Sequence, residues 1–342
     1  MKDIAIVILN WNGKQLLEQF LPQVIAYSED ARIIVADNAS SDDSIEYLKH
    51  NFSSVEILKN SSNGGFAKGY NDALKRVDAE FYLLLNNDVE VTKNWLKPLR
   101  KVMENAKVAG CQPKILSQKN KTHFEHAGAS GGFIDKNYFP FCRGRLFDEV
   151  EEDKGQYNEE IEIFWATGAC LLIRSELYHK ANGFDELFFA HMEEIDLCWR
   201  IKKWGYSFLA VPTSTVFHVG GGTLPYSSPR KIYYNFRNNL YMLVKNHDGL
   251  LFPKLFYRML LDGIAAMMFL LKGQLKAFAS VFNAHMSLYK NLGKLLKQRK
   301  VIKKGVTNFN SSGIYHGSIL WAYFVRKIKV SSELKQEKFR LK

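Results

Sequence analysis

This chain of 342 residues has few cysteines. Its four cysteines show no CxxC spacing, which argues against a disulfide-rich scaffold and a structural zinc site. A secretory leader pattern is also missing at the N-terminus, where Ile4–Leu9 is predicted to be a first strand. We therefore expect a reduced, cytosolic compartment. The cysteines are Cys111, Cys142, Cys170 and Cys198.

Long apolar runs are missing as well. The most apolar segment, Leu255–Leu271, contains Arg258 and Asp262, and its uninterrupted part is only Gly263–Leu271. That part is much shorter than the roughly 20 residues that span a bilayer. Two interpretations stay open for this segment: a helix that lies on a membrane surface, or an ordinary core or oligomer helix.

The dinucleotide-binding fingerprint GxGxxG is not found after the first predicted strand. The sequence there is Leu9-Asn10-Trp11-Asn12-Gly13. A nicotinamide-dependent enzyme is therefore disfavoured. The same stretch lacks the Gly-rich loop with a basic residue that a nucleotidyltransferase would normally show.

The formal net charge of +12 lies entirely in the C-terminal tail. Residues 286–342 hold 14 Lys or Arg and 2 Asp or Glu, whereas the first 285 residues are neutral. Such a tail suits anionic lipid headgroups or nucleic acid. A solvated tail that aids solubility is the alternative.

The first half of the chain alternates between strand and helix patterns, which predicts βαβ units in a mostly parallel sheet with helices on both faces. The predicted strands are 4–9, 31–36, 55–58, 81–85 and 108–115, and the predicted helices are 16–27, 41–51, 65–77 and 94–104.

The second half is less regular. Residues 116–160 are predicted to form a long functional loop or hairpin insert. Residues 161–173 are expected to form a core strand, and 207–211 a strand that ends at Pro212. From Tyr233 the pattern is helical. We expect two parts: a catalytic α/β domain over 1–240 and a basic, helical extension over 241–342.

Asn86-Asn87-Asp88 is the most informative motif. It follows the buried strand predicted over 81–85, and open α/β sheets bind ligands at the carboxyl ends of their strands. One acid and two amides are too few for an all-protein metal site. They suit a hard cation that takes most of its oxygens from water and a diphosphate.

Two further motifs point to a nucleotide. Asp37 follows a buried strand, where it can accept hydrogen bonds from a base or ribose, and Asn38 can cap the next helix. Gly64 and Gly65 permit close backbone approach, and the helix start after them can face a phosphate.

Acids gather at a predicted helix start over 193–204. Glu193, Glu194 and Asp196 are favoured there by the helix dipole alone. If this end faces the cleft, one of the glutamates is a candidate general base. Asp196 and Arg200 are four residues apart, which predicts an ion pair. His218 precedes the glycine run 220–222, so either a structural role or a metal or diphosphate contact is open.

These motifs together resemble the family 2 glycosyltransferases, and most closely the bacterial rhamnosyltransferase-like branch. The resemblance covers about residues 3–240. The motifs that carry it are Asp37-Asn38-Ala39-Ser40-Ser41-Asp42, Asn63-Gly64-Gly65-Phe66-Ala67, Asn86-Asn87-Asp88 and Glu193-Glu194-Ile195-Asp196-Leu197-Cys198.

The resemblance implies a GT-A fold, an inverting mechanism, a nucleotide-diphosphate sugar donor and Mg²⁺ or Mn²⁺. It implies that Asp88 binds the metal as the last position of a DxD motif, in which Asn86 replaces the first acid. Glu194 matches the position of the catalytic aspartate, and Glu193 is the alternative base. The metal set is expected to be Asp88, Asn86 and His218. The nucleotide-sugar set is expected to be Asn10, Asn12, Asp37, Asn38, Asn63, Gly64, Gly65, Phe66, Asn71 and Asn87, and the acceptor side is expected to hold Thr167, Gly168 and Asp196.

The leading hypothesis is a transferase that adds a sugar to a glycan or lipid-linked acceptor in cell-surface polysaccharide synthesis. It would sit peripherally on the cytoplasmic face of the inner membrane, held by an anionic surface. The alternatives are a catalytically inactive sugar-nucleotide binder, a nucleotidyltransferase, or a nucleic-acid binder acting through the tail. Nucleic acid is not the expected partner because the tail shows no recognisable binding motif. The donor sugar, the base, the acceptor and the oligomeric state stay open.

Overall fold

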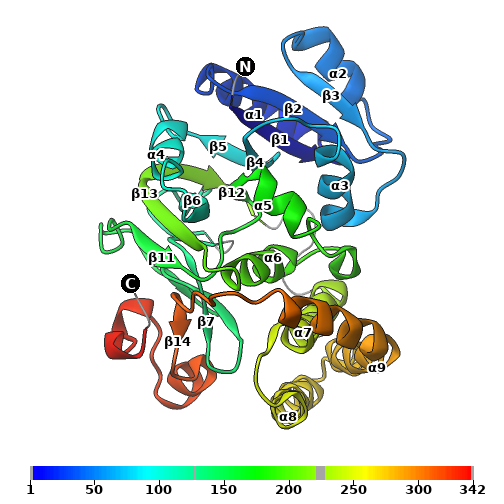
Figure 1. The fold of residues 1–342 in the computed structure, drawn as a ribbon, viewed down its shortest axis with the longest axis vertical. Coiled ribbons are helices and arrows are strands. Elements are labelled where there is room, and N and C mark those ends of the chain that lie inside the picture. Colours follow the sequence, from blue (N-terminus) through cyan, green and yellow to red (C-terminus); the bar gives the residue numbers. More distant parts are fainter. Residues whose placement is uncertain (1–2, 126–127, 221–227, 340–342) are drawn as a thin grey trace.

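The computed structural model describes residues 3–125, 128–220 and 228–339. Gly221 and Gly222, from the glycine run after His218, therefore lie outside the described residues. The molecule is elongated, with the N-terminal strands at one end of the long axis and the C-terminal helices at the other (Figure 1).

The centre of the fold is a mixed sheet of nine strands in the order β11-β13-β6-β12-β4-β1-β2-β3, with β5 paired to β13. Strands β1 to β4 are parallel, as predicted. Strand β12 runs antiparallel to both β4 and β6, so the sheet is mixed rather than mostly parallel. The strands are β1 (Ile4–Asn10), β2 (Arg32–Asp37), β3 (Glu56–Lys59), β4 (Phe81–Asn86), β5 (Val89–Val91), β6 (Val108–Ser117), β11 (Ile161–Ile163), β12 (Cys170–Arg174) and β13 (Ser207–His218).

Two strand predictions are wrong. The single strand expected over 161–173 is two strands, because the buried segment 164–169 leaves the edge of the sheet and returns at its centre. Strand β13 does not end at Pro212 but continues to His218. The register shifts between Val211 and Thr215, and this irregularity accommodates a residue that has no N–H to donate.

The two faces of the sheet carry separate apolar cores because successive strand residues point to opposite faces. Ile6 of β1 packs in the cluster that contains Leu17, whereas the next residue, Val7, packs with Tyr70 on the other face. The covering helices are α1 (Lys14–Ala26), α2 (Ser44–Asn51), α3 (Gly65–Leu74), α4 (Leu96–Val102), α5 (Ser175–Lys180) and α6 (Glu193–Lys202).

The predicted insert over 116–160 contributes four strands of a second, five-stranded sheet with the order β10-β9-β8-β7-β14. Its last strand comes from the chain's tail and runs parallel to β7. The predicted C-terminal extension is therefore tied to the insert. The strands are β7 (Gly132–Asp135), β8 (Pro140–Cys142), β9 (Arg145–Leu146), β10 (Glu149–Val150) and β14 (Ile314–Tyr315).

Three long helices lie at the opposite end from the N-terminal strands (Figure 1). They are α7 (Pro229–Asn246), α8 (Leu251–Leu271) and α9 (Leu275–Lys304). The predicted boundary at 240/241 falls inside α7. Continuous helix ends at Lys304, after which the chain forms β14 and short helical turns. Within the residues described, no helix has the length and apolar character needed to cross a membrane.

Candidate active site

The polar ends of β1, β2 and β4 meet at one edge of the sheet. Register places Asn10 beside Asp37 and Leu9 beside Asn86. The Asn10 amide donates to Asp37 Oδ1 at 3.4 Å and accepts from the Asn87 amide at 2.9 Å. The structure thus brings together Asn10, Asp37 and Asn87, three members of the nucleotide-sugar set that the resemblance implies; their role in binding stays a prediction.

The loops after these strands are held to one another by amide side chains. The Ser41 backbone N–H donates to Asn12 Oδ1 at 2.7 Å. The Asn38 amide donates to Asn63 Oδ1 at 2.9 Å and to the Gly65 carbonyl at 3.2 Å. Trp11 lies in the first of these loops with 49% of its surface exposed, which leaves an aromatic face free at this edge.

Gly65 begins α3 at a point where the backbone is crowded. Its φ is +85°, and a Cβ added there would lie 2.7 Å from the carbonyl oxygen of Phe189. That oxygen accepts the Phe66 backbone N–H at 2.9 Å. The loop from Asn63 to Phe66 is thereby fixed against the segment that precedes α6.

Replacing Gly65 by Ala is expected to lower the free energy of unfolding by about 1–3 kcal/mol, because the positive φ and the Phe189 contact both oppose a side chain. Thermal unfolding would measure the change. Gly293→Ala is the matched control: nothing lies within 4 Å of its added Cβ in α9, so it should stabilise the chain by up to about 1 kcal/mol. Equal melting temperatures for both variants would contradict this account.

Asp88 and His218 face each other although 130 residues separate them. Strand β5 pairs antiparallel with β13, which sets Val89 opposite His218. His218 Nε2 lies 3.0 Å from Asp88 Oδ1, and the Asn86 amide is 3.4 Å from the same nitrogen. On the other side of the ring, Nδ1 lies 3.0 Å from Glu125 Oε2.

The two carboxylates control the charge of His218. Burial by itself lowers the pKa of the imidazole, but the hydrogen bonds and charges of Asp88 and Glu125 outweigh it and raise the pKa to about 10. Across the described part of the chain, no three His, Cys, Asp or Glu side chains are grouped to hold a metal ion by themselves. The predicted metal set therefore offers one carboxylate, one imidazole and one amide.

Glu193 and Glu194 open α6 after an unusual stretch of backbone. His191 and Met192 both have φ of 71°, the left-handed region that side chains disfavour. One carboxylate oxygen of each glutamate is buried without a hydrogen-bond partner. Such orphaned oxygens are costly in a folded protein unless a ligand or a reaction uses them.

The two glutamates are driven toward the protonated form. Burial and the nearby charge of Glu194 raise the pKa of Glu193 well above its usual range. Burial raises the pKa of Glu194 to about 7. The backbone N–H groups at the helix start oppose this rise, because they stabilise the charged carboxylate. Glu193 is the more buried of the two, so Glu194 is the one that can ionise near neutral pH.

Helix α7 holds the segment before the glutamates in place. The Asn238 amide donates to the carbonyls of Phe188, Ala190 and His191 at 2.7–3.0 Å. The Arg237 guanidinium donates to the Leu187 and Phe188 carbonyls. One side chain that donates to three carbonyls within the segment 188–191 stabilises a backbone conformation that would otherwise be strained.

The glutamates and the Asp88–His218 pair share one neighbourhood. Burial raises the pKa of the Cys142 thiol to about 12, and Glu125 and Glu194 are both close enough to add to this rise. Glu125 in turn contacts His218. Cys142 of strand β8 is therefore near both Glu125 and Glu194.

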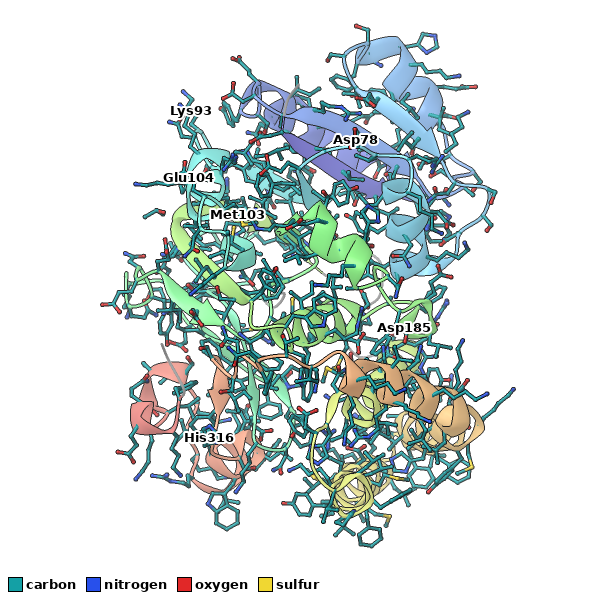
Figure 2. The ribbon with its side chains drawn as sticks, viewed as in Figure 1. Asp78, Lys93, Met103, Glu104, Asp185 and His316 are labelled. Atoms are coloured by element: carbon teal, nitrogen blue, oxygen red, sulfur yellow. The ribbon has the colours of Figure 1, made fainter. Side chains whose placement is uncertain are left out.

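Two predicted roles are wrong. Asp196 has no exposed surface, so it cannot meet an acceptor. It contacts Arg200 at 2.8 Å, as the spacing predicted, and Lys245 at 2.8 Å. Although burial opposes ionisation, these two cations lower its pKa. Lys245 also reaches Asp185, which Figure 2 labels beside the C-terminal helices.

Asn71 was expected to bind the nucleotide, but both ends of its side chain are occupied by contacts within the fold. Its carbonyl accepts from the Tyr178 hydroxyl and the Phe184 N–H, and its amide donates to the Phe184 carbonyl. Both ends of the side chain hold the turn at Phe184. Sequence reasoning could not separate this role from ligand binding because the partners lie more than 100 residues away.

Thr167 and Gly168 lie in the segment that joins β11 to β12. Thr167 is buried, and its hydroxyl accepts from the Ala169 N–H at 3.2 Å. A Cβ added at Gly168 would lie 3.0 Å from the Phe66 ring. Their expected contact with the acceptor stays a prediction, and the structure gives them a packing role against the donor-side loop.

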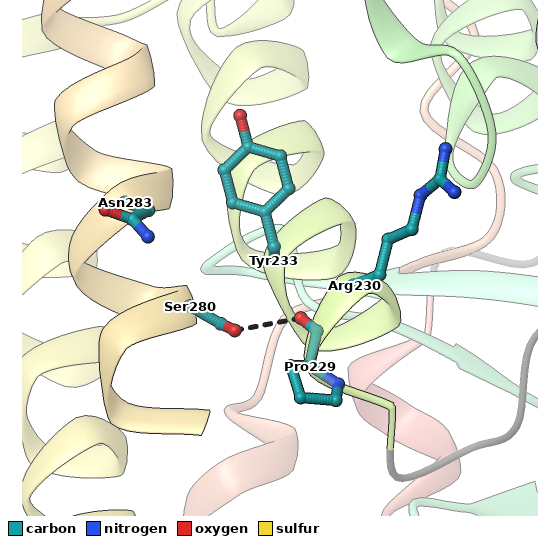
Figure 3. Close-up of a pocket in the computed structure, with 5 residues that line it drawn as sticks. All are labelled: Pro229, Arg230, Tyr233, Ser280 and Asn283. Carbon is teal, nitrogen blue, oxygen red and sulfur yellow. Dashed lines mark hydrogen bonds between the residues drawn. The ribbon is translucent and has the colours of Figure 1, made fainter. Parts of the chain in front are cut away.

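A pocket of about 420 Å³ opens between α7 and α9, lined by Pro229, Arg230, Tyr233, Ser280 and Asn283. Figure 3 shows Arg230 extending away from Ser280 and Asn283. Its guanidinium lies 5.3 Å from the ring centroid of Phe189. The pocket thus adjoins the segment that leads into the two glutamates.

Sequence reasoning missed three residues of this site: Glu125, His191 and Asn238. Glu125 lies in a segment with no periodic pattern. Burial and the charge of Lys231 lower the pKa of His191 to about 4, so this imidazole is neutral beside the glutamates. Asn238 carried no distinctive signal, because the same helix also contains Asn235, Asn239 and Asn246.

The chain is similar in sequence to several glycosyltransferases. A hexosyltransferase of low-salt glycan biosynthesis from Haloferax volcanii, Agl10, is 21% identical over 59% of this chain and 62% of its own length. An N-acetylglucosaminyl-diphospho-decaprenol L-rhamnosyltransferase from Mycobacterium tuberculosis is 23% identical over 64% of this chain and 76% of its own length. Rhamnosyltransferase WbbL from Escherichia coli is 22% identical over 63% and 83%. The chain thus spans less than two thirds of the first of these relatives.

Solved structures agree on the fold. GalNAc-T7 with UDP, GalNAc and Mn²⁺ superposes with a TM-score of 0.55 at 17% identity, over 72% of this chain and 48% of that one. A second structure is the mannosyltransferase PcManGT from Pyrobaculum calidifontis in complex with GDP-Man and Mn²⁺. It superposes with a TM-score of 0.52 at 14% identity, over 88% of this chain and 85% of that one. The predicted GT-A fold is confirmed.

The family profile described as "Glycosyl transferase family 2" matches residues 5–180, which contain the strand ends of the donor side and Asn86-Asn87-Asp88. Together with the rhamnosyltransferase relatives, this match shows that the chain belongs to glycosyl transferase family 2.

Proposed function

We propose that this protein transfers a sugar from a nucleotide-diphosphate donor to a hydroxyl group of a glycan or lipid-linked acceptor, with inversion at the anomeric carbon. The observation that carries the proposal is the pair of orphaned carboxylate oxygens on Glu193 and Glu194. They belong to the same neighbourhood as Asp88 and His218 at the carboxyl edge of the sheet. An acceptor hydroxyl placed against one of these oxygens would satisfy it.

Glu194 is the proposed general base. At neutral pH it can take the proton of the acceptor hydroxyl while that oxygen attacks the anomeric carbon. Glu193, with its pKa raised further, stays protonated. The pair therefore carries one negative charge, which avoids the repulsion of two buried carboxylates. A single displacement of this kind needs no enzyme nucleophile.

The residues present fit a divalent cation. Asp88 and Asn86 supply one carboxylate and one amide, and His218 adds an imidazole nitrogen once a bound cation displaces its proton, because the protonated ring has no free lone pair. Several positions remain for diphosphate and water oxygens. When bound, Mg²⁺ or Mn²⁺ would neutralise charge on the departing diphosphate. Asp37, Asn38 and the loop 63–66 would hold the nucleoside, with the exposed face of Trp11 available for stacking on the base.

The names of the relatives guide the choice of substrates. Several are rhamnosyltransferases, and one acts on a diphospho-decaprenol acceptor. We therefore propose dTDP-rhamnose as the first donor to test and a lipid-linked glycan as the acceptor class. The product would enter cell-surface polysaccharide, at the cytoplasmic face of the inner membrane.

A thermal-shift panel of dTDP-, UDP- and GDP-sugars, each with and without Mn²⁺, tests the donor site. A donor that binds only the folded chain raises its melting temperature, by an amount that corresponds to about 2.7 kcal/mol at a hundredfold excess over Kd. We expect a metal-dependent shift with one nucleotide. Incubation of that donor with a lipid-linked acceptor should then yield an inverted glycosidic bond. No shift with any donor would contradict the proposal.

A further inference from the structure

Helix α8 exposes an apolar face to the outside while it buries two charged residues. The buried stripe includes Arg258 and Asp262, whose side chains pair at 3.4 Å inside the protein. The opposite stripe faces outward and is apolar. Its exposed members are Phe252, Phe256, Leu260, Ile264, Met267 and Leu271, spaced at three or four residues along the helix.

The buried charges of α8 are held by the fold. The Arg258 guanidinium donates to Asn239 Oδ1 at 2.6 Å and lies 3.6 Å from the ring centroid of Phe139. His285 of α9 lies 3.5 Å from Asp262. These contacts fix the rotation of α8 about its axis, so the apolar stripe cannot turn inward without breaking them.

Helix α9 extends the same apolar surface. The Tyr289 hydroxyl meets the Met259 sulfur of α8 at 3.9 Å, which sets the two helices side by side along this stretch. Phe282 and Met286, one turn away on the same face, are 56% and 42% exposed. We call the exposed apolar side chains of α8 and α9 together the α8–α9 face. Exposed patches of this kind mark an interaction site.

Lysines surround this face. Lys272 and Lys276 stand exposed at the turn between the two helices, and Lys290, Lys294 and Lys297 follow along α9. A shallow cavity of about 490 Å³ beside α8 adds Lys136 and Lys254 at the other end. Apolar side chains bordered by cations match an anionic lipid surface, in which the apolar groups enter the acyl boundary and the lysines meet headgroups.

The tail contributes a second element of the same kind. Trp321 and Phe324, in the short helical segment Trp321–Val325, are 60% and 48% exposed, and Arg326 and Lys327 follow them. Tryptophan next to cationic residues is typical of membrane interfaces. Strand β14, just before this segment, lies toward the same end of the long axis as α8, away from β1 to β3 (Figure 1).

We propose that the α8–α9 face docks on an anionic membrane surface, with α8 lying in the plane of the interface. A second copy of this chain fits the face less well, because two such faces brought together would oppose their lysine borders. The docking goes beyond the transferase chemistry. It also suits a lipid-linked acceptor, since the pocket at Arg230 and Tyr233 lies between α7 and α9, on the same helical layer.

Vesicle sedimentation of the full chain tests the proposal. Phosphatidylglycerol-containing vesicles are expected to bind the protein, and neutral phosphatidylcholine vesicles to bind it at least about tenfold more weakly. Phe256→Gln with Ile264→Gln should weaken binding about tenfold or more, because it removes apolar insertion without changing charge. Both side chains point outward. The variant should therefore lose vesicle binding while it keeps the wild-type melting temperature and the wild-type thermal shift with the sugar donor.

Charge variants supply the matched control. Lys272→Gln with Lys276→Gln should weaken binding, and high salt should have the same effect. Lys93→Gln with Lys101→Gln removes the same charge from exposed positions of the N-terminal half, where Figure 2 labels Lys93 far from α8, and should leave binding unchanged. Three results would overturn the proposal: no binding to anionic vesicles, equal binding by the Phe256/Ile264 variant, or a stable dimer that this variant dissociates. Each of these three results can be distinguished from failure of the proposed transferase function, which would appear as the absence of a donor-induced rise in melting temperature.

Discussion

Glu194→Gln is expected to lower kcat by about 10²–10⁴-fold while donor binding is retained. Glutamine keeps the size of the side chain but cannot accept the proton of the acceptor hydroxyl. The wild-type rate should rise with pH through about 7, because the pKa of Glu194 lies there and only the deprotonated carboxylate is a base. Below that pH the protonated form predominates and the rate falls. Steady-state kinetics across this pH range, together with the thermal shift by donor, measure both effects.

The matched control for this prediction is Glu176→Gln. Glu176 occupies the first turn of α5, as Glu194 does in α6, but it is exposed. The Glu176→Gln variant should therefore keep the wild-type transfer rate and the wild-type pH dependence of that rate. Glu193→Gln separates the two candidates: if Glu193 is already protonated, its replacement by Gln changes the rate far less than Glu194→Gln does. A Glu193→Gln variant as inactive as the Glu194 variant would assign the base to the other glutamate or to the pair.

Asp88→Ala is expected to abolish the metal-dependent part of the donor's thermal shift and to lower kcat/KM by roughly a hundredfold or more. Asp88 is the sole carboxylate of the predicted metal set, and the charge stabilisation that a bound cation supplies is worth several kcal/mol. Loss of about 3 kcal/mol corresponds to about a hundredfold in rate. Donor shifts with and without Mn²⁺ and a transfer assay provide the two measurements.

Asp78→Ala controls for this change. Asp78 is exposed and lies just before β4, at the opposite end of that strand from Asp88; Figure 2 labels it. The Asp78→Ala variant should leave the metal-dependent donor shift and kcat/KM unchanged. Removing Asp88 also leaves His218 with Glu125 as its remaining carboxylate partner, so the melting temperature without ligand must be compared first. A metal-dependent donor shift that survives in Asp88→Ala would contradict the assignment of this carboxylate. A shift that is present in the wild type without any transfer would favour the inactive sugar-nucleotide binder.

Much of the donor side followed from the sequence because it depends on local pattern. Buried apolar runs of five or six residues predicted β1, β2 and β4. Their polar ends meet because parallel neighbours end at the same edge of the sheet. The ion pair of Asp196 with Arg200 was also a local inference, and it is found. These features depend on residues close in sequence or on the period of a strand or helix.

The roles of single polar side chains needed the tertiary structure. Asn38 and Asn71 have the same side chain, and both belong to the predicted nucleotide-sugar set. In the structure Asn38 joins two loops that follow strands, whereas Asn71 holds the turn at Phe184. Nothing in the local pattern distinguishes them. Their partners are chosen by packing between segments that are distant in the chain.

The sequence by itself determined the fold class, the polar strand ends at the carboxyl edge of the sheet and the two candidate glutamates. Only the tertiary structure decided that His218 faces Asp88, that Glu125 completes this contact, and that α7 supports the backbone before α6. It also decided which face of α8 is buried. The apolar and charged residues of α8 could have been oriented either way, and the pairing of Arg258 with Asn239 and Asp262 settled the choice. A helical period shows that two stripes exist, but the partners packed against the helix determine which stripe meets the solvent or a membrane.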